Sequence, residues 1–243
     1  MGYRLQETGD RRQGIGMILE VRAVAPFYKN GFVVGCERTN DAIVIDPGDE
    51  AGELVDAARR HRLTVKYILL THAHVDHITG VGPAQSAFGA PVYLHKDDLP
   101  FYERAVQQGQ MFGLAVQQPP AVDVFYDLSP IWFGDYEVRV HHTPGHCPGG
   151  VCLEVREKGG GGRDQGEEGM GVQLVVGDTL FAGSIGRTDL PGGNYEILMR
   201  SITDVLFPLG DEAIVHPGHG PDTTIGRERQ TNPFVLEYLA SRT

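Results

Sequence analysis

The first ninety residues alternate short apolar runs with segments rich in turn-forming residues. Runs of β-branched and other apolar residues that are bounded by Gly, Asp, Asn or Pro are typical of strands. Residues 49–62 begin with acidic and end with basic side chains, which is the charge order that a helix dipole favours. We therefore predict a helix at 49–62 and strands at 17–25, 32–36, 42–46 and 65–70.

The rest of the chain continues this alternation of strands and helices. Residues 81–88 and 96–113 are expected to be helical, and Pro100 is tolerated because it lies near the start of the second segment. A further helix is expected at 194–207, with an apolar face formed by Ile197, Met199–Ile202 and Val205–Leu206. The remaining predicted strands lie at 90–95, 136–142, 150–155, 172–176 and 212–215.

This order of elements predicts one α/β domain over residues 1–243, with sheets inside and helices outside. The segment 158–171 interrupts the second half with many glycines and charged residues. Such a composition favours a flexible insertion within the domain and not a linker between two domains.

Composition and charge narrow the class of partner. The chain is 41% hydrophobic and carries a formal net charge of −11, which disfavours a nucleic-acid backbone as its partner. Its N-terminal residues lack the apolar core of a signal peptide, and no apolar run reaches the length of about 18 residues that a membrane span needs. The three cysteines form no C-x-x-C pair. We expect a cytoplasmic protein that acts on a small molecule, away from membranes.

Four segments share one arrangement, in which an apolar strand is followed by a tight turn with metal-binding side chains. The segments are "YILLTHAHVDH", "VRVHHTPGH", "LVVGD" and "AIVHPGHG". Loops held by a rigid scaffold commonly carry functional residues, so these strand ends are expected to meet at one edge. Five imidazoles and two carboxylates would then form a set suited to zinc or a similar metal. The set is His72, His74, Asp76, His77, His146, Asp178 and His219.

The spacing of these residues suggests two neighbouring ions. His72 and His74 are two residues apart, so an extended backbone points both side chains the same way. Asp76 and His77 follow where the chain turns and can face a second ion. Asp178 can offer one oxygen to each ion. Two ions bridged in this way lie roughly 3.5–4 Å apart and can hold a hydroxide between them.

Other polar residues have two plausible roles each. Asp46 is expected either to accept a hydrogen bond from a ligand histidine or to shape a turn. Arg187 is expected to bind a substrate carboxylate or to pair with Asp189. His216 is expected to pack or to support the ligands. His61 and His95 are expected on the surface, one of His141 and His142 buried and the other exposed, and Cys147 and Cys152 packed in the interior.

The motifs "THAHVDH", "HTPGH", "GD" and "PGHG", in this order, resemble the metallo-β-lactamase fold superfamily. The segments "GDTLFAGSIGRTDLPGG" and "HPGHGPDTTIGRERQTNPF" are most similar to glyoxalase II-like hydrolases. The resemblance implies a four-layer αββα sandwich with a metal site at one sheet edge. It also implies two metal sites: one formed by His72, His74 and His146, the other by Asp76, His77 and His219, with Asp178 bridging them.

The function implied by this resemblance is metal-dependent hydrolysis of an acyl thioester such as S-lactoylglutathione. Two divalent ions are expected, zinc first, with iron or manganese as alternatives. Asp76 would orient the attacking hydroxide as well as bind metal, and Arg187 would contact the substrate. Glyoxalase II enzymes continue into a C-terminal helical region that helps to bind glutathione, whereas about one helix is expected in residues 221–243 of this chain.

Two other enzyme classes compete with this interpretation. His72, His146 and Asp178 form the two-histidine, one-carboxylate set of non-haem iron oxygenases, and persulfide dioxygenases also resemble this chain, including its "GRTD" segment. Such an enzyme would oxidise glutathione persulfide with one iron. The retained "PGHG" favours hydrolysis. A secreted β-lactamase is disfavoured because position 178 is aspartate and not cysteine, and because no signal peptide is recognised.

Overall fold

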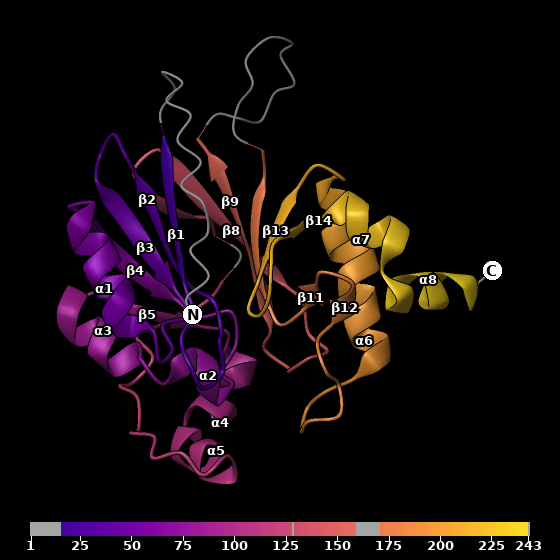
Figure 1. Cartoon of the computed structure of the whole chain (residues 1–243), viewed down its shortest axis with the longest axis horizontal. Helices are drawn as coiled ribbons and strands as arrows, with labels where there is room; N and C mark the ends of the chain where they lie inside the picture. Colours follow the sequence, from indigo (N-terminus) through magenta and orange to yellow (C-terminus); the bar gives the residue numbers. More distant parts are fainter. Residues whose placement is uncertain (1–15, 128, 159–170, 243) are drawn as a thin grey trace.

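The computed structural model describes residues 16–127, 129–158 and 171–242. Two six-stranded sheets face each other at the centre, and helices cover the outer face of each sheet (Figure 1). The four-layer αββα sandwich is therefore confirmed. Residues 159–170, which make up most of the predicted insertion at 158–171, lie outside the described residues.

The first sheet has the strand order β1-β2-β3-β4-β5-β6. In it, β2 is antiparallel to both β1 and β3, and β4, β5 and β6 continue parallel to β3. Its strands are β1 (Met17–Arg22), β2 (Gly31–Cys36), β3 (Asp41–Ile45), β4 (Thr64–Leu69), β5 (Val92–Leu94) and β6 (Val124–Phe125).

The second sheet has the strand order β14-β13-β10-β9-β8-β7. All its neighbours are antiparallel except β10 and β13, which are parallel. Its strands are β7 (Ile131–Phe133), β8 (Tyr136–His142), β9 (Val151–Glu157), β10 (Gln173–Gly177), β13 (Ile214–Pro217) and β14 (Thr223–Thr224), and a small hairpin is formed by β11 (Leu180–Phe181) and β12 (Ser184–Ile185).

The helices fall into three groups. In Figure 1, α1 and α3 lie outside the first sheet, α6 and α7 lie outside the second, and α2, α4 and α5 lie at the lower end. The helices are α1 (Ala51–Arg60), α2 (Val75–Ile78), α3 (Val81–Phe88), α4 (Leu99–Tyr102), α5 (Ala105–Met111), α6 (Tyr195–Arg200), α7 (Ile225–Thr231) and α8 (Pro233–Ala240), with the shorter η1 (Lys96–Asp98), π-helical η2 (Ser201–Leu206) and η3 (Phe207–Leu209).

Alternation along the strands builds the layers. In β3, Ala42 and Val44 pack toward α1 and α3, while Ile43 and Ile45 pack between the sheets. In β9, Cys152 packs toward α6, whereas its neighbours face the space between the sheets. Successive strand residues point to opposite faces, so a sheet that is covered on both sides needs apolar residues at every position.

The single helix predicted at 96–113 was wrong. The chain forms η1, α4 and α5 in succession, with a turn at residues 103–104. Two hydrogen bonds, at positions 102 and 109, hold this segment in its observed path. The buried Tyr102 donates from its hydroxyl to the Pro120 carbonyl over 2.8 Å, while the chain reverses after α5 so that Leu114 N donates to the Gly109 carbonyl over 2.9 Å. Tertiary contacts thus override a continuous helical pattern.

The helix predicted at 194–207 exists, but its buried face differs. Ile197 is 43% exposed, whereas Leu198, Met199, Ile202 and Leu206 are fully buried. Ile202 and Leu206, which are four residues apart, lie in the π-helical η2, whose turn is wider than that of an α-helix. The segment after Gly220 forms two helices, α7 and α8, where about one was expected. Among the described residues, no helix is both long enough and apolar enough to cross a membrane.

Candidate metal centre

The four loops expected to carry metal ligands meet at one end of the sandwich. They follow β4, β8, β10 and β13, and all seven predicted ligand residues are brought together there. Asp76 and His77 sit on α2, which begins directly after His74. Two triads can each hold an ion, because one ligand atom from every member lies within 4.8 Å of those of the other members. The triads are His72–His74–His146 and Asp76–His77–His219.

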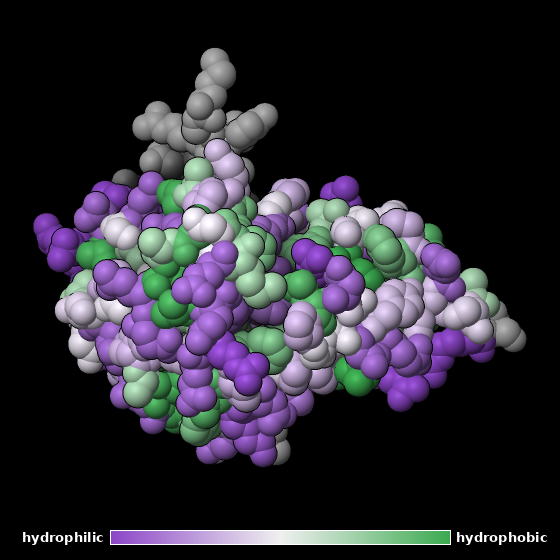
Figure 2. Space-filling view, turned by 90° about the horizontal axis from the view of Figure 1, so that it is seen from below, coloured by the Kyte–Doolittle hydropathy of each residue, from purple (hydrophilic) through white to green (hydrophobic). Residues whose placement is uncertain are grey.

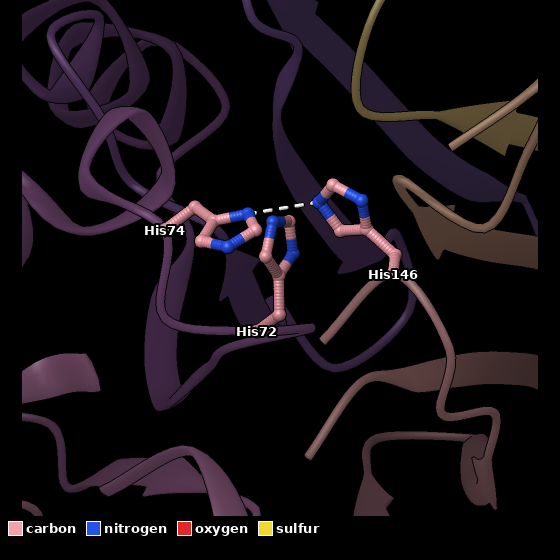
Figure 3. Close-up of side chains that lie close together, drawn as sticks. All are labelled: His72, His74 and His146. Carbon is pink, nitrogen blue, oxygen red and sulfur yellow. Dashed lines mark hydrogen bonds between the residues drawn. The ribbon is translucent and has the colours of Figure 1, made fainter. Parts of the chain in front are cut away.

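The first triad consists of three imidazoles that converge on one point (Figure 3). His72 and His74 come from the loop after β4, and His146 faces them from the loop after β8. His74 Nδ1 and His146 Nε2 are 2.8 Å apart. The three rings meet edge to face, with centroids 4.5–5.0 Å apart. Nitrogen atoms gathered so closely in a buried place are the arrangement that a transition metal requires.

The second triad joins two elements that are distant in sequence. His219 Nε2 donates to Asp76 Oδ2 over 3.1 Å. His77 Nε2 lies 3.8 Å from the same oxygen. Asp178 lies between the two triads, with Oδ1 3.4 Å from His77 Nε2 and Oδ2 3.7 Å from the Nε2 atoms of both His146 and His219. Asp178 is therefore placed to offer one oxygen to each triad.

Three buried polar atoms at this place have no hydrogen-bond partner among the described residues. They are His72 Nε2, His77 Nε2 and Asp178 Oδ1. A buried polar atom without a partner costs about 1–3 kcal/mol, so three of them in one cluster need an explanation. Divalent ions would give each atom a partner. The donor set of five imidazoles and two carboxylates fits zinc or another borderline metal.

The tautomers of three histidines follow from their outer contacts. His146 Nδ1 donates to the Arg187 carbonyl over 2.8 Å, and His77 Nδ1 donates to Asp46 Oδ2 over 2.9 Å. The Thr71 hydroxyl donates to Asp46 Oδ2, so at 3.1 Å it accepts from His72 Nδ1. Each contact leaves Nε2 as the nitrogen that faces the centre. Ligand histidines are typically oriented in this way.

The histidines of the segment "THAHVDH", residues 71–77, lie in opposite electrostatic environments. Burial and the facing His146 ring lower the pKa of His74 to about 3, and burial with the neighbouring imidazoles keeps the pKa of His72 well below its usual value. Burial also disfavours charge on His77, but the Asp76, Asp46 and Asp178 carboxylates outweigh it and raise its pKa to about 10. For Asp178, burial is outweighed by His77 and the facing imidazoles, which lower its pKa.

Asp46 accepts a hydrogen bond from His77, one of the predicted ligands, which agrees with the first of its two expected roles. Its side chain is fully buried and also accepts from Thr71 N over 2.6 Å. Its backbone has a positive φ of 48°, which is uncommon for a residue other than glycine. Asp46 therefore joins the strand end that carries His72 to the helix that carries His77.

The sequence analysis did not identify a buried ion pair that contacts the backbone of Asp46. Lys29 and Glu50 are 1% and 2% exposed and form a salt bridge, and Lys29 Nζ also donates to the Asp46 carbonyl. The backbone of Lys29 pairs with His219. Asn30 N donates to the Gly218 carbonyl over 2.6 Å. One short segment thus holds both Asp46 and the loop of His219.

Asp98 and Gln108 are further supports without a motif. The buried Asp98 accepts from Ala73 N over 2.9 Å and from Gly149 N over 2.6 Å, and burial raises its pKa. Gln108 donates to the Ala73 carbonyl over 2.9 Å. Ala73 lies between His72 and His74, so both side chains fix the loop of the first triad. A lone aspartate or glutamine in a helical segment gives no sequence signal of this role.

Two glycines allow their loops to lie directly against Asp178. A Cβ on Gly218 would lie 2.2 Å from Asp178 Oδ1, and one on Gly186 would lie 1.8 Å from the Asp178 carbonyl. Any side chain at either position would displace Asp178. The spacing "PGHG" therefore reflects the need for backbone beside the centre as well as for the histidine.

The remaining predicted site residues lie outside the seven-residue cluster. The Arg187 guanidinium pairs with Asp189 through two hydrogen bonds of 2.8 and 2.7 Å, and both side chains are exposed. His216 is buried and contacts Gln173 Oε1 at 2.9 Å, so its packing role is confirmed. His141 is half-buried beside Glu154, His142 is exposed, and Cys147 and Cys152 are buried as expected.

Apolar side chains are exposed on two segments that contact each other, residues 27–28 and the end of α5. Tyr28, next to the Lys29–His219 bridge, is 66% exposed, and Phe112 at the end of α5 is 56% exposed. Phe27 and Phe112 meet edge to face at 5.8 Å, which joins the two segments. Figure 2, which views the molecule from this lower end, shows hydrophobic patches among mostly hydrophilic residues.

Comparison with known proteins gives a consistent picture. Residues 24–160 match the Metallo-beta-lactamase superfamily. A protein of Haemophilus influenzae named hydroxyacylglutathione hydrolase GloC is 35% identical over 229 residues, which cover 90% of this chain and 98% of that protein.

Two solved structures are similar over almost their whole length. The di-iron-bound form of TTHA1623 is 39% identical with a TM-score of 0.75 and covers 88% of this chain and 99% of its own. The BLEG-1 B3 metallo-beta-lactamase is 34% identical with a TM-score of 0.77 and covers 90% and 99%.

Proposed function

Because the chain belongs to the metallo-beta-lactamase superfamily, we propose that it is a metal-dependent hydrolase that cleaves small acyl thioesters, with S-lactoylglutathione as the leading substrate. The observation that carries this proposal is the complete donor set. Both triads are formed, and Asp178 lies between them with an oxygen 3.4–3.7 Å from three ring nitrogens.

We assign His72, His74 and His146 to one divalent ion and Asp76, His77 and His219 to a second, with Asp178 serving both. Zinc is the first choice because imidazole nitrogen and carboxylate oxygen suit it, and iron or manganese are the alternatives. When bound, such ions lower the pKa of a coordinated water to near 7 and polarise a carbonyl oxygen.

The side chains of this protein prepare the site for that chemistry. Burial disfavours charge on Asp76, but the adjacent His77 and His219 lower its pKa, so Asp76 remains a carboxylate. Its oxygen can accept a hydrogen bond from the attacking water and orient it toward the acyl carbonyl. Thr71, Asp46 and the Arg187 carbonyl keep three imidazoles pointing their Nε2 atoms at the centre.

A thioester suits a site of this kind. A thiol has a pKa of about 8.5, so it departs as a thiolate with little need for a proton donor. The exposed Arg187 could exchange its pairing with Asp189 for a carboxylate of the substrate, as a guanidinium binds both in the same two-pronged way. Glutathione conjugates carry such carboxylates.

The relative named hydroxyacylglutathione hydrolase supports this choice. The alignment spans 98% of that protein, so a hydrolase of that name has little sequence beyond the part that matches this chain. A longer C-terminal helical region is therefore not a condition for the proposed substrate class. The BLEG-1 similarity makes a β-lactam the natural competing substrate.

The test combines metal analysis with three assays on the purified protein. S-lactoylglutathione, a chromogenic cephalosporin and glutathione persulfide with an oxygen electrode are offered in parallel. We expect two equivalents of metal and release of free thiol from the thioester, both retained in a His61→Asn control at a surface histidine. A single iron with oxygen uptake and no thioester cleavage would overturn the proposal, as would faster opening of the β-lactam.

A further inference from the structure

A second group of metal-binding side chains lies outside the seven-residue centre. His95 follows β5 of the first sheet, His142 ends β8 of the second, and Asp97 lies on η1. The two imidazoles are stacked, with centroids 4.2 Å apart and an angle of 15° between their planes. One ligand atom from each of the three residues lies within 4.8 Å of the other two. We call these three residues the peripheral triad.

The tautomer of His142 suits a ligand. Its Nε2 lies 2.9 Å from the Pro148 carbonyl oxygen, which can only accept a hydrogen bond. Nε2 therefore carries the hydrogen, and Nδ1 carries the free lone pair of the neutral ring. A backbone carbonyl that fixes the second nitrogen is the usual outer contact of a metal-bound histidine.

The frame of the peripheral triad is fixed by backbone contacts. His142 pairs with Val151 across β8 and β9. Asp98 N donates to the His95 carbonyl over 3.0 Å, and the buried Asp98 side chain holds Gly149 N in place. The two imidazoles are thus presented from two sheets that are already packed together, so little ordering is needed to bring in an ion.

The charges of the peripheral triad favour a cation over a proton. Burial and the facing His142 ring lower the pKa of His95, which favours the neutral ring, and its Nδ1 accepts one long hydrogen bond of 3.4 Å from Asp97 N that an ion can replace. Asp97 Oδ2 lies 3.8 Å from His95 Nδ1 and supplies the negative charge.

We propose that His95, Asp97 and His142 form a separate, solvent-exposed site for a divalent transition metal ion such as Zn²⁺, Ni²⁺ or Cu²⁺. Two imidazoles select these ions over Mg²⁺ and Ca²⁺, which prefer oxygen ligands. Because Asp97 and His142 are exposed, water completes the coordination and the ion exchanges readily. This site does not depend on the proposed hydrolase activity.

The experiment counts ions on the metal-loaded protein by equilibrium dialysis against Cu²⁺ or Ni²⁺, with the metal alone as the probe. Wild type is expected to bind one equivalent more than His142→Asn and His95→Asn, and Asp97→Asn is expected to bind that ion more weakly. His61→Asn is the matched control, because His61 pairs with Glu20 as a histidine and carboxylate at the surface. It should retain the additional equivalent.

Spectroscopy supplies a second, independent measurement. The additional Cu²⁺ should show electron paramagnetic resonance coupling to two nitrogens, reduced to one in His142→Asn if any residual ion binds. Equal thermal unfolding midpoints in wild type and His142→Asn would exclude loss of fold as the cause. The proposal is overturned if wild type binds no more ions than His142→Asn and His95→Asn, or if the signal shows one nitrogen in wild type.

Discussion

The two triads of the metal centre differ in the groups that contact them from outside the seven-residue cluster. In the first, His72–His74–His146, the outer contacts of the rings are uncharged: the Thr71 hydroxyl meets His72 and the Arg187 carbonyl meets His146, while the Asp98 carboxylate contacts only a backbone amide of the loop. The second, Asp76–His77–His219, is backed by the Asp46 carboxylate and the buried Lys29–Glu50 ion pair. In the segment "THAHVDH", burial and the His146 ring lower the pKa of His74 to about 3, whereas the Asp76, Asp46 and Asp178 carboxylates outweigh burial and raise the pKa of His77 to about 10. Burial and neighbouring carboxylates therefore decide which of these histidines carries a charge, and residue type and spacing alone do not.

Asp178→Ala should produce the largest effect, because it removes the residue that the two triads share. We expect loss of metal from both triads, and a greater loss than any single histidine substitution causes. Metal content measured by mass spectrometry after dialysis checks this. A variant that still holds two equivalents would show that Asp178 does not serve both ions, and that the triads are independent.

His219→Ala should separate the triads. It removes a ligand of the second triad only, so about one of two equivalents should remain, and thioester hydrolysis should slow markedly because Asp76 loses its partner at 3.1 Å. Metal content and turnover are measured on the same sample. Unchanged metal content near one in both wild type and variant, with oxygen uptake on glutathione persulfide, would point to a mononuclear oxygenase.

Lys29→Met tests the charged backing of the second triad. Removing one member of a buried ion pair costs roughly 3–5 kcal/mol, because Glu50 is left as a buried charge. The double variant Lys29→Met/Glu50→Gln removes that charge and should recover most of the thermal stability. It should not recover full affinity for the second ion, because the contact from Lys29 Nζ to the Asp46 carbonyl remains lost.

For the single and the double variant, stability is measured by thermal unfolding and affinity for the metal by competition with a chelator. Weakening of an outer contact typically reduces metal affinity by about 10–100-fold. Full recovery of affinity in the double variant would show that the ion pair acts through stability alone.

The pH dependence of the metal-free protein should show the smallest effect. Between pH 6.5 and about 10, folded His77 holds a proton that the unfolded chain loses, so stability falls as pH rises. Between pH 6.5 and about 3, the unfolded chain binds a proton that folded His74 does not, so stability falls as pH drops. Unfolding midpoints after chelator treatment should therefore peak near pH 6.5.

Two conservative variants assign the two limbs of this curve. His77→Gln should flatten the alkaline limb and leave the acid limb, whereas His74→Gln should reduce the acid limb only. His72, whose pKa is also well below its usual value, should sustain part of the acid limb. The reverse assignment would contradict the difference between the two triads.

The parts of the centre that sequence could predict are those that local geometry determines. "THAHVDH" follows a buried strand, so an extended step places His72 beside His74 and the start of α2 turns Asp76 and His77 to the other side. By contrast, Lys29, Asp98 and Gln108 reach the centre from segments with no common spacing to it. Only tertiary packing makes them neighbours of the ligands.

Strands and helices likewise divide into those that local sequence predicts and those that depend on tertiary contacts. Long apolar runs such as β3 and β9 were predicted because their residues are buried on both faces. Strands of two residues, such as β6 and β14, are too short to show a period, and they exist because a neighbouring strand offers backbone partners. The break between α4 and α5 likewise follows a contact with a segment further along the chain, from the Tyr102 hydroxyl to the Pro120 carbonyl, and is not evident from the residues at the break.

The pairing of Lys29 with His219 has a consequence for the order in which the protein is made. The loops of the first sheet supply four of the proposed ligands and those of the second sheet supply three, and each triad needs one of the latter. On the ribosome, the first triad is incomplete until His146 has emerged and the second until His219 has emerged. A second ion would therefore be bound only after His219 has been made, and the segment at residues 29–30 is made before the residue with which it pairs.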